Sequence, residues 1–386
     1  MNIPSILRSL LATGTLLSLY FLGGCSKPST GAAANEILIG HYGSMTGSTA
    51  TFGQSTDKGV RMAAEEINAK GGILGKKIRI VTEDDQGRPE EAVNAVLKLI
   101  NQNRVTAVIG EVASSRSIAA APQCQSARVP MLSPASTNPK VTEIGDFIFR
   151  GCFIDPFQGA AMAKFAMEDL KLRKFAVFTD VKNDYSVGLA KFFKEKVREL
   201  GGEIVADESY SEGDVDFKAQ LTSIKGRNPD AIFLPGYYTE FGLIARQARE
   251  LGMTVPFLGG DGWDSEKTFE IGGKAIIGSY YSNHYSPDDT RPKVREFVKA
   301  FKQQHGQVPD AMAVLGYDSM YMMADSIRRA GSTDGQAIRD ALATIKGFEG
   351  VAGNITMDAG RNAQKSLVVL KIEDGNKTSF VKSVEP

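Results

Sequence analysis

Short apolar runs alternate with helical patterns along most of the chain. Residues 36–42 (EILIGHY) form an apolar run, and Val60, Ala63, Ala64 and Ile67 then recur at the i, i+3, i+4, i+7 spacing of an amphipathic helix. Strands joined by helices of this length form right-handed βαβ units, so the pattern predicts an α/β fold with parallel sheets. Further strands separated by helical segments are expected at residues 77–83, 105–109, 175–179, 203–205, 231–234 and 255–258.

The alternation begins again after Arg150 and Gly151, and the second series is long enough for its own sheet. From His284 onward, long helical patterns at 292–305 and 312–330 are followed by only a few strand patterns. These later segments are most economically placed as caps on two lobes, so the chain would cross between the lobes more than once. We therefore predict two doubly wound parallel-sheet lobes with a hinge and an interlobe cleft, formed by residues 36–155 with 284–360 and by residues 156–283 with 361–386.

Composition narrows the class of protein. The chain has 386 residues, 45 basic against 45 acidic side chains and a formal net charge of zero, which excludes the basic surface that nucleic-acid binders need. Its three histidines and three cysteines show no zinc-ligand spacing, so neither a metal nor a cofactor is expected. Cys124 and Cys152 could be free buried thiols or a disulfide, and the sequence leaves both alternatives open.

The first residues have the pattern of an export signal. Arg8 precedes a 13-residue apolar run at 10–22, which fits a secretory signal and is shorter than the ~20 residues of a membrane span. The run ends in Leu-Gly-Gly-Cys at 22–25, which resembles the lipobox of bacterial lipoproteins. We expect residues 1–24 to be removed, Cys25 to be lipidated, and residues 25–35 to tether the protein to the membrane. The alternative is an ordinary signal peptide with an incidental cysteine.

Polar and glycine-rich segments follow the predicted strands. In open α/β sheets ligands bind beyond the carboxyl ends of the strands, where the free N–H groups of helix N-termini are available. In the first lobe these segments offer hydroxyl groups, and in the second they offer aromatic rings and a carboxylate. The segments are residues 43–53, 111–115 and 133–139 in the first lobe and 183–185, 236–239 and 259–263 in the second.

Those chemical groups suit a zwitterionic amino acid. Its carboxylate would be held by the hydroxyls of Ser114 and Thr137, beside Ser136, together with N–H groups at a helix start. Its ammonium group would be held by Asp261 and the Ala135 carbonyl. An apolar side chain would be enclosed by aromatic rings. The candidates for that enclosure are Phe52, Tyr185, Tyr237 and Trp263.

Each candidate also has an ordinary structural interpretation. Ser114 could be a helix N-cap, Tyr185 and Tyr237 could be packing residues, and Asp261 between glycines could be a turn residue. Their common place at strand ends is what favours a binding site.

Several runs together resemble the leucine/isoleucine/valine-type solute-binding proteins of ABC transporters. The resemblance covers almost the whole chain after the signal, and the order and spacing of the runs carry it. The runs are the lipobox, Ile39-Gly40, Met45-Thr46-Gly47, Phe52-Gly53, residues 67–73 (INAKGGI), Asp84-Asp85, Val108-Ile109-Gly110, Ser133-Pro134-Ala135 with Thr137 and Pro139, and residues 246–249 (RQAR).

The resemblance implies a type I periplasmic binding protein fold whose lobes close on an amino acid and then dock on a membrane permease. By position, Ser114, Ala135 and Thr137 match residues that hold the ligand's carboxylate and part of its ammonium group. Asp261 stands where a glutamate is common, and Phe52 stands where a tyrosine is common. Tyr185 and Tyr237 match aromatic contacts, and Trp263 replaces a smaller residue. The resemblance implies a lipid-anchored protein outside the cytoplasmic membrane.

The sequence leaves three other functions to consider. The ligand could be an amide, urea or an aromatic acid, because an amide would not require Asp261. An extracytoplasmic α/β enzyme would need a signature such as Gly-x-Ser-x-Gly, which is absent from the sequence, although Asp261 and His284 could form an acid–base pair. A sensory ectodomain would need a signalling segment after Pro386. We therefore expect a transport protein that is not an enzyme.

Overall fold

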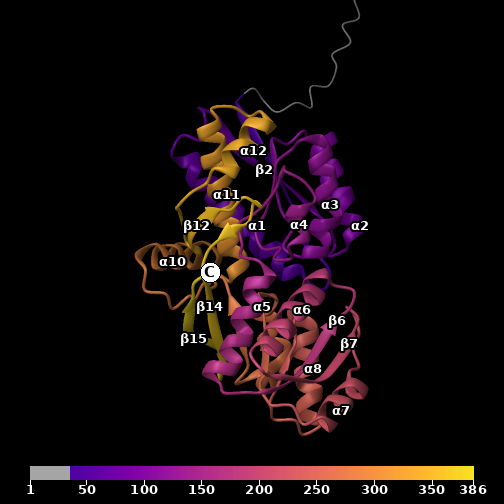
Figure 1. Cartoon of the computed structure of the whole chain (residues 1–386). Helices are drawn as coiled ribbons and strands as arrows, with labels where there is room; N and C mark the ends of the chain where they lie inside the picture. Colours follow the sequence, from indigo (N-terminus) through magenta and orange to yellow (C-terminus); the bar gives the residue numbers. More distant parts are fainter. Residues whose placement is uncertain (1–34) are drawn as a thin grey trace, which may run out of the picture. The chain divides into compact units, whose positions relative to one another are not determined.

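The computed structural model describes residues 35–386, which form two main sheets flanked by helices (Figure 1). The predicted signal peptide, the lipidation site at Cys25 and nearly all of the tether lie outside the described residues. Within residues 35–386, no helix has both the length and the apolar character needed to cross a bilayer.

The first sheet has five parallel strands in the order β2-β1-β3-β4-β5. Its strands are β1 (Glu36–Gly43), β2 (Lys77–Asp84), β3 (Ala107–Ile109), β4 (Met131–Ser133) and β5 (Ile148–Arg150). The helices that connect them are α1 (Ala50–Ala69), α2 (Pro89–Asn101), α3 (Ser114–Ala127) and α4 (Lys140–Glu143). The sheet and its helices are called the first lobe below.

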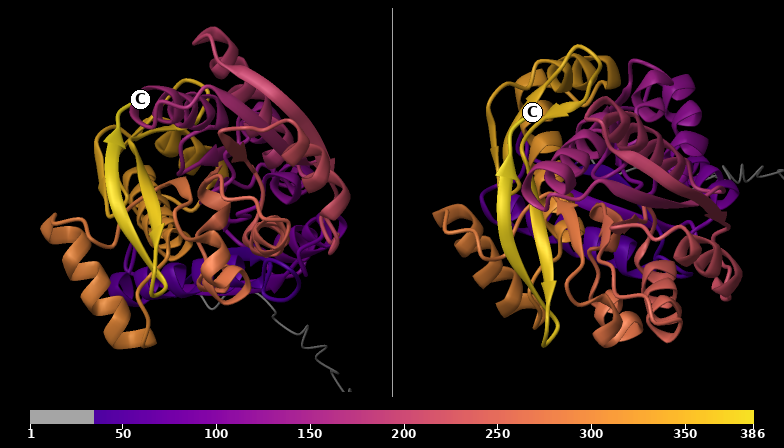
Figure 2. Two further views of the ribbon diagram at one scale, coloured as in Figure 1. Left: turned by 90° about the horizontal axis from the view of Figure 1, so that it is seen from below. Right: turned by 60° about the horizontal axis from the view of Figure 1, so that its bottom comes forward.

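The second sheet has seven strands in the order β15-β14-β10-β9-β8-β6-β7. The strands from β10 to β7 are parallel, whereas β14 and β15 are antiparallel and form a long hairpin at one edge (Figure 2). The second lobe is therefore mixed rather than wholly parallel. Its strands are β6 (Lys174–Asp180), β7 (Glu203–Tyr210), β8 (Ala231–Phe233), β9 (Phe257–Gly259), β10 (Tyr280–Asn283), β14 (Leu367–Glu373) and β15 (Lys377–Val384).

The helices of the second lobe follow the predicted order. They are α5 (Asp155–Lys164), which continues as a π-helical turn (Phe165–Asp169), α6 (Asp184–Glu199), α7 (Lys218–Gly226), α8 (Tyr238–Glu250) and α9 (Glu266–Gly272), with 3-10 turns at Asp261–Trp263 and Gly273–Ile276. Helix α6 is capped by Asn183, whose side chain accepts hydrogen bonds from the Tyr185 and Ser186 N–H groups. This cap fixes Tyr185 in the first turn, at the carboxyl end of β6.

The remaining elements join the first lobe. They are α10 (Pro292–His305), α11 (Ala311–Ala330), α12 (Gly335–Ala343) and a small sheet of β11 (Phe348–Gly350), β12 (Gly353–Met357) and β13 (Ala363–Gln364). Met320 on α11, Ile338 on α12 and Ile355 on β12 share an apolar core with Ile39 of β1. Only the β14–β15 hairpin returns to the second lobe, so these segments do not cap both lobes equally.

The chain passes between the two sheets three times. The crossings are residues 151–154 before α5, residues 284–291 after β10, and residues 365–366 before β14. The predicted lobe limits at 155/156, 283/284 and 360/361 fall near these crossings and stay predictions. Cys124 and Cys152 are free, buried thiols.

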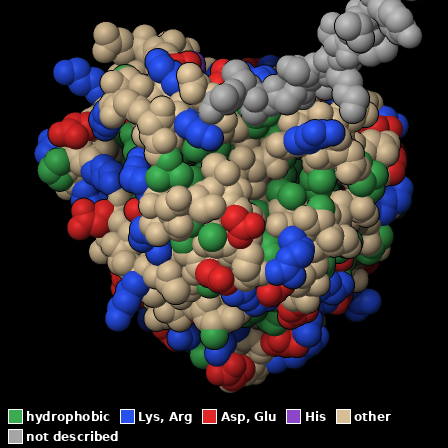
Figure 3. Space-filling model, turned by 90° about the horizontal axis from the view of Figure 1, so that it is seen from above, with side chains coloured by type: hydrophobic (Ala, Val, Ile, Leu, Met, Phe, Trp, Pro, Cys, Tyr) green, Lys and Arg blue, Asp and Glu red, His purple; other side chains and the backbone are tan. Residues whose placement is uncertain are grey.

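Charged side chains of both signs are scattered over the face shown in Figure 3. This mixture is what equal numbers of basic and acidic residues lead one to expect. It contrasts with the single-sign stripe that a nucleic-acid binder presents.

Candidate functional site

A small cavity lies where strand carboxyl ends of the two lobes face each other. Its cavity volume is about 10 Å³, on the scale of one water molecule, so the lobes must part to admit a ligand. Its lining comprises Phe52, Val112, Ser114, Ala135 and Met312 from the first lobe and Tyr185, Tyr237, Asp261 and Gly262 from the second. The structure thus brings together the predicted residues Phe52, Ser114, Ala135, Tyr185, Tyr237 and Asp261.

Three predicted residues do not line this cavity. Thr137 is buried two residues after Ala135, and its hydroxyl has no hydrogen-bond partner within residues 35–386. The Ser136 hydroxyl bonds to the Ser117 hydroxyl at 2.8 Å and to the carbonyl of Glu111 at 3.0 Å, so it ties the loops after β3 and β4 together. The Ser136 hydroxyl is therefore engaged in hydrogen bonds within the first lobe and is not directed at the cavity.

Trp263 lies in the core of the second lobe rather than in the cavity wall. Its ring stacks on Phe241 of α8, with ring centroids 3.5 Å apart and planes inclined by 3°. The prediction that Trp263 helps to enclose the ligand's side chain is corrected by this placement, because the ring packs in the core beneath the turn that carries Asp261.

The start of α3 offers donors to the cavity. Its N-cap residue, Ala113, has no side chain that could accept hydrogen bonds from the first-turn N–H groups, so these groups have no intrahelical partner. Ser114 is the first helical residue rather than the cap, which rules out the N-cap interpretation. Its hydroxyl accepts a hydrogen bond from the Asn138 N–H at 3.2 Å and lies at the cavity wall. Uncapped N–H groups and a hydroxyl form an environment for an anionic group.

Asp261 provides the opposite chemistry across the cavity. Its Oδ1 accepts hydrogen bonds from Gln158 Nε2 at 2.7 Å and Tyr185 Oη at 3.0 Å, and its Oδ2 contacts His284 Nε2 at 2.9 Å. Burial lowers the pKa of His284 to about 4, so the imidazole is neutral at pH 7 and donates from Nε2. The Asp261–His284 pair weighed from the sequence is therefore real, as a hydrogen bond between a carboxylate and a neutral imidazole.

Aromatic rings form the rest of the wall. The Tyr185 and Tyr237 rings are parallel, with centroids 5.5 Å apart and planes inclined by 1°. Phe52 of the first lobe meets Tyr237 edge to face at 5.4 Å and 84°, and meets Tyr238 at 5.0 Å. Aromatic contacts therefore cross from one lobe to the other beside the cavity.

Polar contacts also join the lobes around the cavity, so the structure represents a closed arrangement. The Ser115 hydroxyl lies 3.0 Å from Asp184 Oδ2 and accepts the Asp184 N–H at 2.8 Å. On the other side, the Thr51 and Ser265 hydroxyls are 2.9 Å apart. Arg116 of α3 reaches Glu212, which follows β7, at 3.4 Å.

The Arg116 guanidinium also serves a buried acidic cluster. It lies 3.8 Å from Glu111, whose carboxyl is fully buried. Burial, followed by the negative charge of Asp85, raises the pKa of Glu111 to about 8. This cluster stands behind the loop after β1 and links the strand ends of the first lobe to the interlobe contact.

Sequence reasoning missed three lining or supporting residues, Val112, Gln158 and Met312, and it paired His284 with Asp261 only as an acid–base alternative. Val112 belongs to the strand-end segment 111–115, but the polar groups of such segments, not their apolar residues, are what the sequence argument selects. Gln158 lies 103 residues from its partner Asp261, so no local pattern connects them. His284 follows β10 directly, and the strand-end rule applied to that strand would have selected it.

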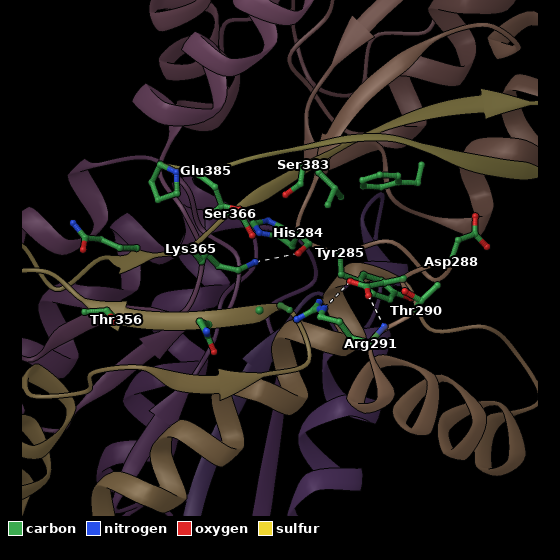
Figure 4. Close-up of a pocket in the computed structure, with 18 residues that line it drawn as sticks. His284, Tyr285, Asp288, Thr290, Arg291, Thr356, Lys365, Ser366, Ser383 and Glu385 are labelled. Atoms are coloured by element: carbon green, nitrogen blue, oxygen red, sulfur yellow. Dashed lines mark hydrogen bonds and ion pairs between the residues drawn. The ribbon is translucent and has the colours of Figure 1, made fainter.

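A larger cavity, about 770 Å³, lies beside the hinge (Figure 4). Its walls come from two of the crossings and from β12, β14 and β15, and they include His284, Arg291, Lys365 and Ser366. We call it the hinge cavity. It lacks the convergence of strand carboxyl ends that marks ligand sites in α/β sheets, so the interlobe cavity is the better candidate for the ligand.

Two doubly wound lobes, three crossings and a small cavity enclosed by both lobes define a bilobal solute-binding protein. The same class follows from sequence comparison. The family described as periplasmic binding protein matches residues 36–377, and the chain belongs to that family. It is accordingly an extracytoplasmic solute-binding protein, and the predicted fold class and family resemblance are confirmed.

Named relatives fit this assignment. The chain is 32% identical over 349 residues to Leu/Ile/Val-binding protein homolog 3 of Brucella melitensis, covering 89% of this chain and 93% of that protein. The solved leucine binding protein LivK of Thermotoga maritima superimposes with a TM-score of 0.87 and 42% identity, over 91% of this chain and 99% of that one. LivJ of Streptococcus pneumoniae, solved in complex with isoleucine, has a TM-score of 0.86 and 36% identity, over 91% and 100%.

Proposed function

We propose that this protein captures an apolar L-amino acid, of the branched-chain type, in the interlobe cavity and delivers it to the permease of an ABC transporter. The observation that carries the proposal is the placement of a triply hydrogen-bonded carboxylate, Asp261, opposite the uncapped start of α3. A zwitterionic amino acid can direct its ammonium group at Asp261 and its carboxylate at the start of α3. The amino-acid ligands in the names of LivK and LivJ support the same class of solute.

In this proposal the ligand's carboxylate contacts Ser114 and the first N–H groups of α3, and it reaches the Thr137 hydroxyl, which lies outside the present lining, once the lobes adjust to the ligand. Its ammonium group contacts Asp261 and the Ala135 carbonyl. Its side chain lies among aromatic and aliphatic groups, which suit a hydrocarbon. Those groups are Phe52, Val112, Tyr185, Tyr237 and Met312.

Transport requires no chemical step, so we propose that the protein is not an enzyme. A ligand that touches both lobes binds the closed form more tightly than the open form and shifts the equilibrium by that difference. The contacts of Arg116 with Glu212 and of Ser115 with Asp184 then add to the closed form, which the permease would bind. We also propose that lipidation of Cys25 holds the protein at the outer face of the cytoplasmic membrane or in the periplasm.

A thermal-shift panel tests the ligand class. L-leucine, L-isoleucine and L-valine are expected to raise the melting temperature most, because a ligand at 100 times its Kd stabilises the folded state by about 2.7 kcal/mol. The panel includes the twenty L-amino acids, D-leucine, isovaleramide, urea and benzoate. Isovaleramide and benzoate lack the ammonium group and should give no shift. A larger shift with benzoate or an amide than with any amino acid would contradict the proposal.

Ser114→Ala is expected to weaken amino-acid binding without changing the fold. Removing one hydrogen-bond partner of a buried charged group raises the binding free energy by about 1–3 kcal/mol, which is roughly 5- to 150-fold in Kd. Isothermal titration calorimetry measures the change. Ser126→Ala is the matched control, because Ser126 is an exposed serine near the other end of α3. Equal affinities for the two variants would remove Ser114 from the site.

A further inference from the structure

His284 lies between the ligand site and the hinge. It follows β10 directly, and Asp261 follows the adjacent parallel strand β9, so their hydrogen bond is internal to the second lobe. We propose that His284 is a positioning residue that holds the Asp261 carboxylate in the orientation that receives the ligand's ammonium group, and that it does so from the hinge. This inference rests on the proposed function and adds a residue to its site.

The two oxygens of Asp261 are held differently. Gln158 and Tyr185 both donate to Oδ1, at 2.7 and 3.0 Å. Among the described side chains and backbone groups, the contact of Oδ2 is with His284 Nε2 alone, at 2.9 Å. Without the imidazole, the carboxylate plane can turn about the bonds to Oδ1, and the oxygen presented to the cavity is no longer fixed.

His284 is in turn fixed by all three crossings. Its ring stacks on Phe153 of the first crossing, with centroids 4.0 Å apart and planes inclined by 19°. Its own backbone begins the second crossing, and its carbonyl accepts a hydrogen bond from Lys365 Nζ of the third at 3.1 Å. No local sequence pattern would reveal this meeting of residues 153, 284 and 365. It makes the position of the imidazole depend on the hinge.

The hinge cavity gives access to this residue from outside the ligand site. His284 and Lys365 both line that cavity, and the close-up shows their hydrogen bond at its wall (Figure 4). His284 Nδ1 is buried and has no hydrogen-bond partner within residues 35–386. The imidazole itself is fully buried, and removing it would leave a space next to the lining of the cavity of about 770 Å³, from which we expect a small molecule to enter.

The charges around the ring agree with a donor role. Burial and the positive charge of Lys365 oppose protonation of His284, and Asp261 favours it, with a net lowering of the pKa to about 4. A neutral imidazole has one N–H, and the Asp261 carboxylate is the acceptor that it faces. The Nε2–H tautomer is the form that this contact requires.

The experiment uses chemical rescue through the hinge cavity. His284→Ala is expected to weaken binding of L-leucine by about 10- to 100-fold, as loss of a hydrogen bond to a charged group does. At a pH well above the pKa of both compounds, imidazole should restore part of the affinity, whereas neutral N-methylimidazole, which has no N–H group, should not. His284→Gln, whose amide can donate, should retain more affinity than His284→Ala. Ser366→Ala, at the same cavity but without contact to Asp261, is the control and should bind normally.

Two results would overturn the proposal: undiminished affinity in His284→Ala, or equal rescue by imidazole and N-methylimidazole, which would indicate mere filling of space. A ligand-free measurement separates this inference from the proposed function. Nitrogen-15 NMR of the wild-type protein should show His284 as the Nε2–H tautomer, with its resonances shifted in Asp261→Asn. An Nδ1–H tautomer would refute the positioning role, whereas the correct tautomer in a protein that binds no amino acid would refute only the proposed function.

Discussion

Asp261→Ala is expected to abolish measurable amino-acid binding while the protein remains folded. The substitution removes the carboxylate opposite the ligand's ammonium group and leaves three donors, Gln158, Tyr185 and His284, directed at a cation. Breaking a buried ion pair by removing one partner changes the free energy by about 3–5 kcal/mol, which is roughly 150- to 5000-fold in Kd. Calorimetry with L-leucine measures the loss, and circular dichroism checks the fold.

The control variants separate charge from shape. Asp261→Asn keeps the volume of the side chain and removes its charge, so it should bind almost as poorly as Asp261→Ala. Asp207→Ala removes an exposed carboxylate of β7 that pairs with Lys194 at the surface, and it should leave affinity unchanged. Affinity within twofold of wild type in Asp261→Asn would show that the ligand carries no ammonium group at this position. It would then favour an amide or an aromatic acid.

Helices and strands with a regular apolar pattern were predictable, because the apolar positions in their own sequence are the ones that become buried. The pattern over 292–305 predicts a helix at the bounds that α10 has, and the apolar run at 36–42 is β1 with one further residue. The pattern fails where an element has little apolar surface of its own. No residue of strand β15 (KTSFVKSV) is buried, and the strand is held by pairing with β14, so its existence depends on a neighbour rather than on hydrophobic alternation.

The candidate site was predictable as far as topology alone determines it. Parallel strands end at the same edge, which brings Ser114, Ala135, Tyr185 and Asp261 to one cavity. The direction of a side chain depends on packing, and Trp263 shows the difference: it shares a turn with Asp261 yet stacks on Phe241 in the core. Gln158 became recognisable only through the Asp261 oxygen that it contacts, and the contact of His284 with the other oxygen gives that residue a structural role in place of the acid–base role that the sequence suggests.

Helices α1 and α11 pack so closely that a substitution at their contact is expected to lower the free energy of unfolding more than any other change considered. A Cβ atom added at Gly59 would lie well inside van der Waals distance of the Ala313 carbonyl oxygen and 2.9 Å from the Tyr317 nitrogen. From the opposite helix, a Cβ at Gly316 would lie 2.5 Å from the Thr56 oxygen and 3.1 Å from its Cα. These neighbours are backbone atoms, which cannot move aside by changing a rotamer. The two helices must therefore separate to admit even one methyl group.

Gly59→Ala is accordingly expected to destabilise the fold by about 3 kcal/mol, the upper part of the range for overpacked cores, although alanine is intrinsically the better helix former. Gly226→Ala, in α7, adds the same methyl group where no atom lies within 4 Å, so it should be neutral or slightly stabilising. Urea unfolding of both variants measures the difference as a shift in midpoint at constant slope. Equal midpoints would mean that α1 and α11 can move apart freely. The first lobe would then owe little of its stability to their contact.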